Sequence, residues 1–219
     1  MDGRLTVRIG IGGWTYEPWR GVFYPDGLVQ RRELEYAAQH LTAIEINATF
    51  YGRQKPASWR KWGEAVPEGF QFTVKASRYS TARKVLAEGA DSIEKFLNQG
   101  FTELGDKLGP ILWQFAPTKH FERDDFARFL DLIPDSQDGV ALRHALEIRH
   151  ESFADPTFFE LARTRNMAVV FADSDEYPCI DEATADFSYA RLQRTEESVE
   201  TGYDNKSLDA WADKARRMK

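Results

Sequence analysis

The sequence predicts an α/β fold, a TIM-like (β/α) barrel, and three observations lead to this prediction. Short β-rich runs alternate with amphipathic helical stretches, which is typical of right-handed βαβ units around a parallel sheet. Seven strand–helix units can be recognised, and polar residues gather toward the carboxyl ends of the strands, where such barrels place their active sites. We expect residues 1–219 to form a single domain whose eighth strand is missing or incomplete. An open doubly wound sheet is the alternative.

The predicted strands are seven short runs rich in β-branched and aromatic residues. They comprise residues 5–14, 43–51, 70–77, 109–115, 144–150, 168–174 and 187–193. The sequence shows no repeat, low-complexity segment or linker that would divide them between two domains.

Apolar stripes predict helices between these strands. Residues 31–41 and residues 91–108 each repeat apolar side chains three and four positions apart, along one helical face. Gly100 lies inside the second stretch, where glycine is unfavourable by up to about 1 kcal/mol.

Three more helices are predicted from their ends and patterns. Residues 124–133 open with an acidic first turn, as a helix amino terminus prefers. Residues 155–165 begin with Asp155 as a cap and Pro156 at the first helical position. Residues 207–219 form a last amphipathic helix.

The composition argues against several classes of protein. A net charge of −6 and an isoelectric point near 5.4 oppose general nucleic-acid binding, which needs a basic surface. The single cysteine, Cys179, rules out internal disulfide bonds and fits a reducing compartment. Neither an apolar signal segment nor a run long enough to span a bilayer is found, so we expect a cytoplasmic protein without membrane contact.

Polar side chains recur toward the carboxyl-terminal half of every predicted strand after the first. They are Glu45, Asn47, Lys75, Gln114, Glu147, Arg149, Asp173 and Arg191. Alternate residues of a strand share a face, so Glu45 points the same way as Asn47. In a barrel all these side chains would meet at one mouth, whereas an open sheet would spread them along a line.

The formal charges of these strand-end residues cancel. The negative members are Glu45, Glu147 and Asp173, and the positive members are Lys75, Arg149 and Arg191. A divalent metal site would prefer an excess of carboxylates with some histidines, so we expect neither a metal nor a cofactor. The set suits a polar ligand with anionic parts or a purely architectural network of ion pairs, and the cost of desolvating so many charges favours the ligand. We expect Glu45 to pair with Lys75 or with Arg149.

Five motifs closely resemble the YecE-like family, catalogued as domain of unknown function 72. They are "GIGGWTYEPWRGVFYP" (10–25), "LEYAAQHLTAIEINATFYGRQKPASWRKW" (34–62), "FQFTVKAS" (70–77), "LGPILWQFAP" (108–117) and "ALEIRHESF" (145–153). The resemblance implies a TIM-like barrel with a polar pocket at the strand carboxyl ends, and it implies no established reaction. It adds Trp14, Tyr16, Trp19 and Tyr51 to the strand-end residues as candidates for substrate binding.

The chain departs from the family pattern in two places. Gln193 and Arg194 follow the arginine of "YARL", where family members usually have histidine and glycine. Family members commonly continue into an eighth strand, whereas this chain stops at Lys219. Exposed edges on the first and seventh strands would favour aggregation, which a homodimer contact or a truncated chain would explain.

Our leading hypothesis is an enzyme that performs acid–base chemistry on a small polar or anionic metabolite, sugar- or nucleotide-like. The catalytic candidates are Glu45, Lys75, Glu147 and Asp173, and either glutamate would act as the acid or base. Arg149 and Arg191 would clamp an anionic group, and the amides of Gln114 and Asn47 would orient it. A non-catalytic protein that binds a metabolite or a nucleic-acid end, and a metal-dependent hydrolase or isomerase, are the alternatives.

The loop of residues 77–89 follows the strand that carries Lys75. It contains Arg78, Arg83 and Lys84. It is either a solvated surface loop or a mobile basic lid that recruits a phosphate or carboxylate.

Overall fold

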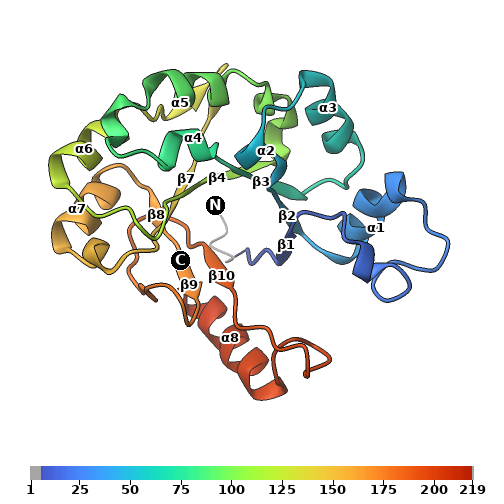
Figure 1. The fold of residues 1–219 in the computed structure, drawn as a ribbon. Coiled ribbons are helices and arrows are strands. Elements are labelled where there is room, and N and C mark those ends of the chain that lie inside the picture. Colours follow the sequence, from blue (N-terminus) through green and yellow to red (C-terminus); the bar gives the residue numbers. More distant parts are fainter. Residues whose placement is uncertain (1–5, 219) are drawn as a thin grey trace.

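The computed structural model describes residues 6–218, and its centre is a six-stranded parallel sheet (Figure 1). The strands are β1 (Gly10–Gly12), β2 (Ala43–Ile46), β3 (Gln71–Lys75), β4 (Leu108–Gln114), β7 (His144–Glu147) and β8 (Ala168–Val169). Their order in the sheet is their order in the chain, and every neighbouring pair is parallel. The carboxyl ends of all six strands therefore lie at the same edge of the sheet.

Two further strands, β9 (Phe171–Asp173) and β10 (Ala190–Leu192), follow β8 in the chain. Only Val170 separates β8 from β9, and β9 pairs in parallel with β10. Each of the seven predicted runs thus contains or overlaps a strand; β4 matches its predicted length but begins one residue earlier, and the other strands are shorter than predicted. Leu5 and Lys219, at the outer ends of the first predicted strand and the last predicted helix, lie outside the described residues.

Helices cover the outer side of the sheet in Figure 1. The longer ones are α1 (Glu33–His40), α3 (Pro56–Glu64), α5 (Ala90–Leu97), α6 (Arg123–Asp131), α7 (Pro156–Thr164) and α8 (Asn205–Arg217). Two short helices, α2 (Ala48–Tyr51) and α4 (Arg78–Thr81), directly follow β2 and β3. The predicted cap of α7 is present, since the Asp155 carboxylate accepts a hydrogen bond from the Thr157 backbone N–H at 2.7 Å.

The single helix predicted over residues 91–108 is wrong. Helix α5 ends at Leu97, and a 3-10 helix follows over Phe101–Lys107. Gly100 stands between them with a φ of 89°, in the left-handed region that glycine adopts without steric cost. The apolar stripe continues through the break because Phe101 and Leu104 are still buried.

A small hairpin was missed by the sequence analysis. Strands β5 (Ser136–Gln137) and β6 (Val140–Ala141) pair antiparallel around Asp138 and Gly139, which have φ values of 50° and 78°. Two consecutive positive φ angles in an Asp-Gly pair are the signature of a tight hairpin turn, so the signal was present.

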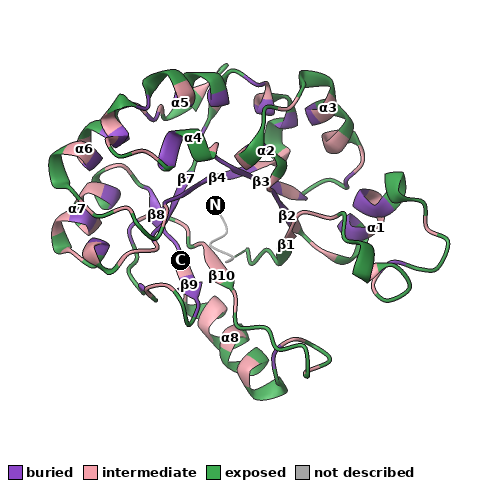
Figure 2. Cartoon of the chain, viewed as in Figure 1, coloured by how far each residue is buried: buried purple, intermediate pink, exposed green. Residues whose placement is uncertain are grey.

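Strands β2, β3, β4, β7 and β8 are largely buried on both faces, as parallel strands between covering layers usually are, whereas β1 and β10 contain no buried residue (Figure 2). Side chains on the outer face of the strands, such as Leu146, pack against the helices in the main apolar cluster. A smaller cluster on the inner face contains Leu112, Ala145, Ala168 and Val170, with Phe187 and Tyr189 packed against it. The small side chains of Ala145 and Ala168 leave room on this face for long polar side chains.

Candidate functional site

Glu147, at the end of β7, organises the polar side chains at the carboxyl ends of the strands. It is fully buried. Its Oε1 accepts hydrogen bonds from Arg149 Nε at 3.0 Å and Nη2 at 2.9 Å. Its Oε2 accepts hydrogen bonds from Gln114 Nε2 at 2.8 Å and Arg191 Nη1 at 2.6 Å. Gln114 and Glu147 are direct neighbours in the β4–β7 ladder, so their side chains leave the same face.

The environment of Glu147 keeps it ionised. Burial opposes ionisation, but the charges of Arg191 and Arg149 and the hydrogen bond from Gln114 outweigh it and lower the pKa of Glu147 below its ordinary value of 4.5. A carboxylate held in this way fixes the positions of two arginines and is poorly suited to accepting a proton at neutral pH.

Glu45, on β2, lies on the same inner face. Its Oε2 accepts a hydrogen bond from the Tyr189 hydroxyl at 2.9 Å, and that hydroxyl lies 3.2 Å from Thr73 Oγ1. Its Oε1 lies 3.4 Å from Arg191 Nη2. The ion pair therefore differs from the expected one with Lys75 or Arg149. The register pairs Glu45 with Thr73, so Lys75 stands two positions further along β3.

Lys75 ends β3 in a largely buried position, with 9% of the residue exposed. Its Nζ lies 4.6 Å from the centre of the Phe50 ring, and it has no hydrogen bond or ion pair with other residues in the range 6–218. Burial lowers the pKa of Lys75; Glu45 opposes this effect, and the neighbouring Arg191 adds to it.

We define the charged cluster as Glu45, Lys75, Gln114, Glu147, Arg149 and Arg191. Two carboxylates and three cations give it a formal charge of +1. The sequence predicted a net charge of zero for the strand-end residues. The charged cluster instead has one excess positive charge, because Asp173 lies on the other face of the sheet.

Asp173 lies on the outer face of the sheet. In the β9–β10 ladder Arg191 is opposite Ala172, so Asp173, one residue further on, leaves the other face. Its carboxylate pairs with Arg194 at 3.1 Å and accepts hydrogen bonds from Tyr203 OH at 3.0 Å and Trp211 Nε1 at 3.2 Å. Arg194, which with Gln193 departs from the family pattern, thus helps to hold the segment before α8.

A pocket of about 440 Å³ lies beside Asp173, between residues 194–204 and α8. The basic side chains that line this pocket already form ion pairs within the chain. Arg194 contacts Asp173 and also Asp175, at 2.9 Å, and Lys214 pairs with Asp181 at 2.6 Å.

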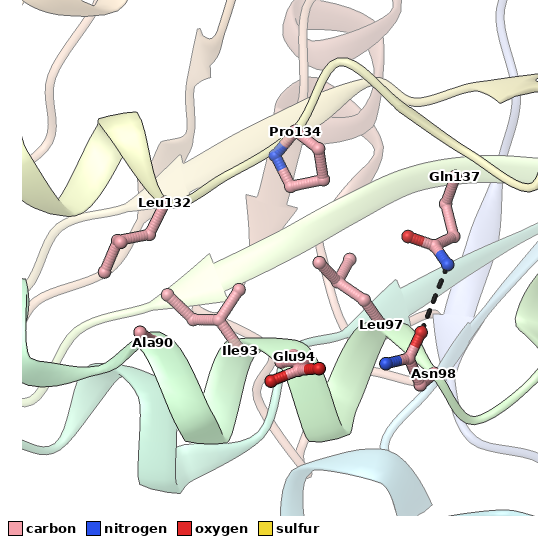
Figure 3. Close-up of a pocket in the computed structure, with 8 residues that line it drawn as sticks. All are labelled: Ala90, Ile93, Glu94, Leu97, Asn98, Leu132, Pro134 and Gln137. Carbon is pink, nitrogen blue, oxygen red and sulfur yellow. Dashed lines mark hydrogen bonds between the residues drawn. The ribbon is translucent and has the colours of Figure 1, made fainter.

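A second pocket, of about 240 Å³, lies on the outer surface between α5 and the segment that follows α6 (Figure 3). It is lined by Ala90, Ile93, Glu94, Leu97, Asn98, Leu132, Pro134 and Gln137. Gln137 Nε2 donates a hydrogen bond to Asn98 Oδ1 at 3.2 Å across it. Its lining includes no member of the charged cluster.

Asn47 stands close to the end of β1. A Cβ atom on Gly12 would lie 2.9 Å from Asn47 Nδ2 and 3.8 Å from Glu45 Oε1. The absence of a side chain at Gly12 therefore leaves the space that Asn47 occupies beside the charged cluster.

The four aromatic candidates divide into two pairs. Trp14 and Trp19 pack against the main apolar cluster, and the Trp14 ring lies 5.3 Å from that of Trp62. Tyr16 and Tyr51 remain exposed. Tyr16 donates its hydroxyl hydrogen bond to the Gly12 carbonyl; burial raises its pKa and the charge of Glu45 adds to the rise, so Tyr16 lies near the charged cluster.

Sequence reasoning missed Tyr189, Thr73 and Tyr177. The Tyr189 hydroxyl contacts both Glu45 and the Thr73 hydroxyl, as described above. The Arg149 guanidinium lies 4.3 Å from the centre of the Tyr177 ring. The signal for Tyr189 was present, because it precedes Arg191 by two positions and so shares its face. Tyr177 lies in a loop whose path the strand pattern does not specify.

The loop of residues 77–89 is tied to α6 by Asp125. The Asp125 carboxylate accepts hydrogen bonds from the backbone N–H of Leu86 at 3.0 Å and of Ala87 at 2.9 Å, and from Lys119 Nζ at 2.9 Å. Leu86 is fully buried. These contacts support an anchored loop more than a mobile lid.

Asp125→Asn is expected to lower the free energy of unfolding by about 1–3 kcal/mol, because an amide cannot replace a carboxylate that accepts three hydrogen bonds. Burial opposes ionisation of Asp125, but its three donors hold its pKa below 3.8. Since the folded pKa lies below the unfolded one, the contribution is complete above about pH 4 and is lost as pH falls through the folded pKa. Urea denaturation across this range measures it, and exposed Asp124→Asn is the control. A similar loss in both variants would contradict the anchoring role.

Residues 6–218 contain no group of three or more His, Cys, Asp or Glu side chains arranged to hold a metal ion. Within the same range, no helix is both long and apolar enough to cross a bilayer.

Known proteins resemble this chain in sequence. The family model described as "Protein of unknown function DUF72" matches residues 8–219. The UPF0759 protein YunF of Bacillus subtilis (strain 168) is 28% identical over 159 residues, which cover 70% of this chain and 54% of YunF. The chain therefore spans about half the length of this curated relative.

Solved structures resemble it in fold. A DUF72 family protein from Thermotoga maritima MSB8 aligns with a TM-score of 0.74 at 23% identity, over 97% of this chain and 88% of its own. A DUF72 family protein from Enterococcus faecalis V583 aligns with a TM-score of 0.68 at 20% identity, over 96% and 77%. At these identities the likeness shows the α/β fold alone. The resemblance seen in the sequence motifs is confirmed by the match over residues 8–219, and the chain belongs to the DUF72 family of proteins of unknown function.

Proposed function

We propose that the charged cluster binds a small anionic metabolite and transforms it by acid–base chemistry. The observation that carries this proposal is the excess of one cation in a largely buried site. A buried charge without a counterion is costly, and an anionic ligand would remove that cost. Ionisable groups in such surroundings are concentrated at functional sites.

The arginines are the proposed anion clamp. Their side chains are 19% exposed for Arg149 and 20% for Arg191, so each retains donors that a ligand can reach. Glu147 fixes both guanidinium groups and thereby preorganises the clamp. In this proposal Glu147 positions the arginines, and the acid–base role falls to Glu45 with its partner Tyr189.

We further propose that the strands curl into a TIM-like barrel around the charged cluster. In a flat sheet of this strand order, β10 and β2 would be five strand spacings apart, or roughly 24 Å. The hydrogen bond of 2.9 Å from Tyr189, which precedes β10, to Glu45 of β2 supports a strongly curved sheet instead. A barrel of this kind would enclose the inner face on which the cluster lies.

Exposed aromatic side chains at the strand carboxyl ends support a ligand with a ring. Tyr51 and Tyr79 are both exposed, and the Arg78 guanidinium lies 5.9 Å from the first ring and 5.2 Å from the second. Tyrosine and arginine faces stack on planar groups, and a sugar or base attached to the anion would contact them here.

The Arg149→Ala variant is expected to bind inorganic phosphate roughly 10- to 100-fold more weakly than the original chain, since it loses charge-assisted hydrogen bonds. Isothermal titration calorimetry at low ionic strength measures this change. Native mass spectrometry of the purified protein tests whether a metabolite is retained, and whether incubation converts it.

Arg143→Ala is the matched control. Arg143 also lies over an aromatic ring, with its guanidinium 5.1 Å from the centre of Phe187. It is exposed and precedes β7, so it lies at the opposite end of the strand from Arg149. Phosphate affinity that falls equally in both variants, or that falls in neither, would contradict the proposed site. Retention without conversion would identify a binding protein.

A further inference from the structure

Lys75 differs from the two arginines of the charged cluster in having no carboxylate at ion-pair distance among residues 6–218. Both oxygens of Glu147 are taken by Arg149 and Arg191. Glu45 accepts a hydrogen bond from Tyr189 at Oε2, and its Oε1 lies 3.4 Å from Arg191 Nη2. The Lys75 ammonium group faces the Phe50 ring instead, 4.6 Å from its centre.

This environment lowers the pKa of Lys75, so a larger fraction of its amine is neutral than in an exposed lysine. An ammonium group that is removed from water without a counterion is costly, and a neighbouring cation increases that cost. Burial is the largest effect on the pKa of Lys75 and lowers it; Glu45 opposes this effect and Arg191 adds to it, and the net shift is downward. A lysine that is desolvated beside other cations becomes a nucleophile toward carbonyl groups.

We propose that Lys75 forms a Schiff base with the carbonyl group of a small anionic oxo acid. This inference rests on the proposed function, because Arg149 and Arg191 would hold the acid group of the ligand. The Lys75 ammonium group first loses a proton, and its amine nitrogen then adds to the carbonyl carbon. The carbonyl oxygen leaves as water, which carries that proton and a second one from the same nitrogen. The product is an iminium ion that keeps the single positive charge, so no oxidant or reductant is consumed.

The test traps the iminium ion on the full chain. The protein is incubated with glyoxylate, a small anionic aldehyde, and with sodium cyanoborohydride, which reduces the iminium ion to a stable secondary amine. Peptide mass mapping then measures the rate of modification at each lysine. Lys75 is expected to react more than about tenfold faster than Lys119.

Lys119 is an internal control of similar burial. Its side chain is 10% exposed, but its ammonium group is paired with Asp125 at 2.9 Å. Modification of Lys75 at or below the rate of Lys119 would overturn the proposal, and the measurement needs no substituted protein. Arg149→Ala is expected to slow modification of Lys75 several-fold, because glyoxylate loses its clamp.

Phosphate calorimetry separates the two proposals, since phosphate has no carbonyl group. Phosphate binding without modification of Lys75 would overturn the Schiff base and leave the anion site intact. Rapid modification of Lys75 without phosphate binding would support the reactive amine and contradict the anion site.

Discussion

Replacing Glu147 by glutamine is expected to lower the free energy of unfolding by roughly 3–5 kcal/mol, the cost of removing one partner from a buried ion pair. The carboxylate is fully buried and accepts hydrogen bonds from Gln114, Arg149 and Arg191. A neutral amide keeps the shape but leaves two partly buried guanidinium groups without compensating charge. Urea denaturation followed by tryptophan fluorescence measures the change.

Glu160→Gln is the control for this effect. Glu160 also pairs with an arginine, Arg163, but its side chain is 72% exposed, and surface ion pairs contribute little to stability. We expect no measurable change in that variant. If Glu147→Gln also left the free energy of unfolding unchanged, the charged cluster would not contribute to the stability of the fold.

The stabilisation by Glu147 is also expected to depend on pH. Its pKa is lower in the folded protein than in the unfolded chain, so the unfolded state binds more protons as the solution becomes acidic. The contribution is therefore complete above about pH 4.5 and is lost as pH falls through the folded pKa. The difference in unfolding free energy between the original chain and Glu147→Gln should shrink over that range.

Phe126→Ala is expected to destabilise the protein by about 3–5 kcal/mol, as large-to-small substitutions of buried aromatic residues do. Phe126, on α6, is 1% exposed. Its ring centre lies within 6 Å of those of Phe115, Phe121, Phe129, Phe153 and Phe158. Truncation would remove contacts with five rings at once and leave a cavity that close-packed neighbours can fill only in part.

Phe126→Leu provides the comparison for the cavity effect. Leucine fills much of the same volume, so its loss of unfolding free energy should be clearly smaller than that of alanine. Equal losses in the two variants would mean that specific aromatic contacts, more than filled volume, hold α6 against the sheet.

The strand positions could be predicted because parallel strands are buried on both faces and read as short apolar runs. The break in the predicted helix 91–108 could not, since its apolar stripe runs on through Phe101 and Leu104. Only the left-handed backbone at Gly100 reveals the change of direction, and a glycine inside a helical pattern does not specify its φ angle.

Much of the candidate site followed from the alternation of side chains along a strand. Counting in twos predicts that Glu45 and Asn47 share a face, and the same count applied to Arg191 predicts that Tyr189 shares its face. Asp173 was assigned to the site because it ends its strand, but the strand end gives the edge of the sheet and not the face. Its face follows from the register of β9 with β10, which pairs Ala172 with Arg191 and Asp173 with Leu192 and which only the structure shows.

The agreement between chain order and sheet order has a consequence for folding. Each new strand can dock on the strand made just before it, so early pairings close short loops at low entropic cost. The contact between Glu45 and Tyr189 is different, because 144 positions separate the two residues. Closing so long a loop is entropically costly, so we expect the contacts of Tyr189 and Arg191 to form late in folding. A chain that lacks them would not offer the complete charged cluster to a ligand.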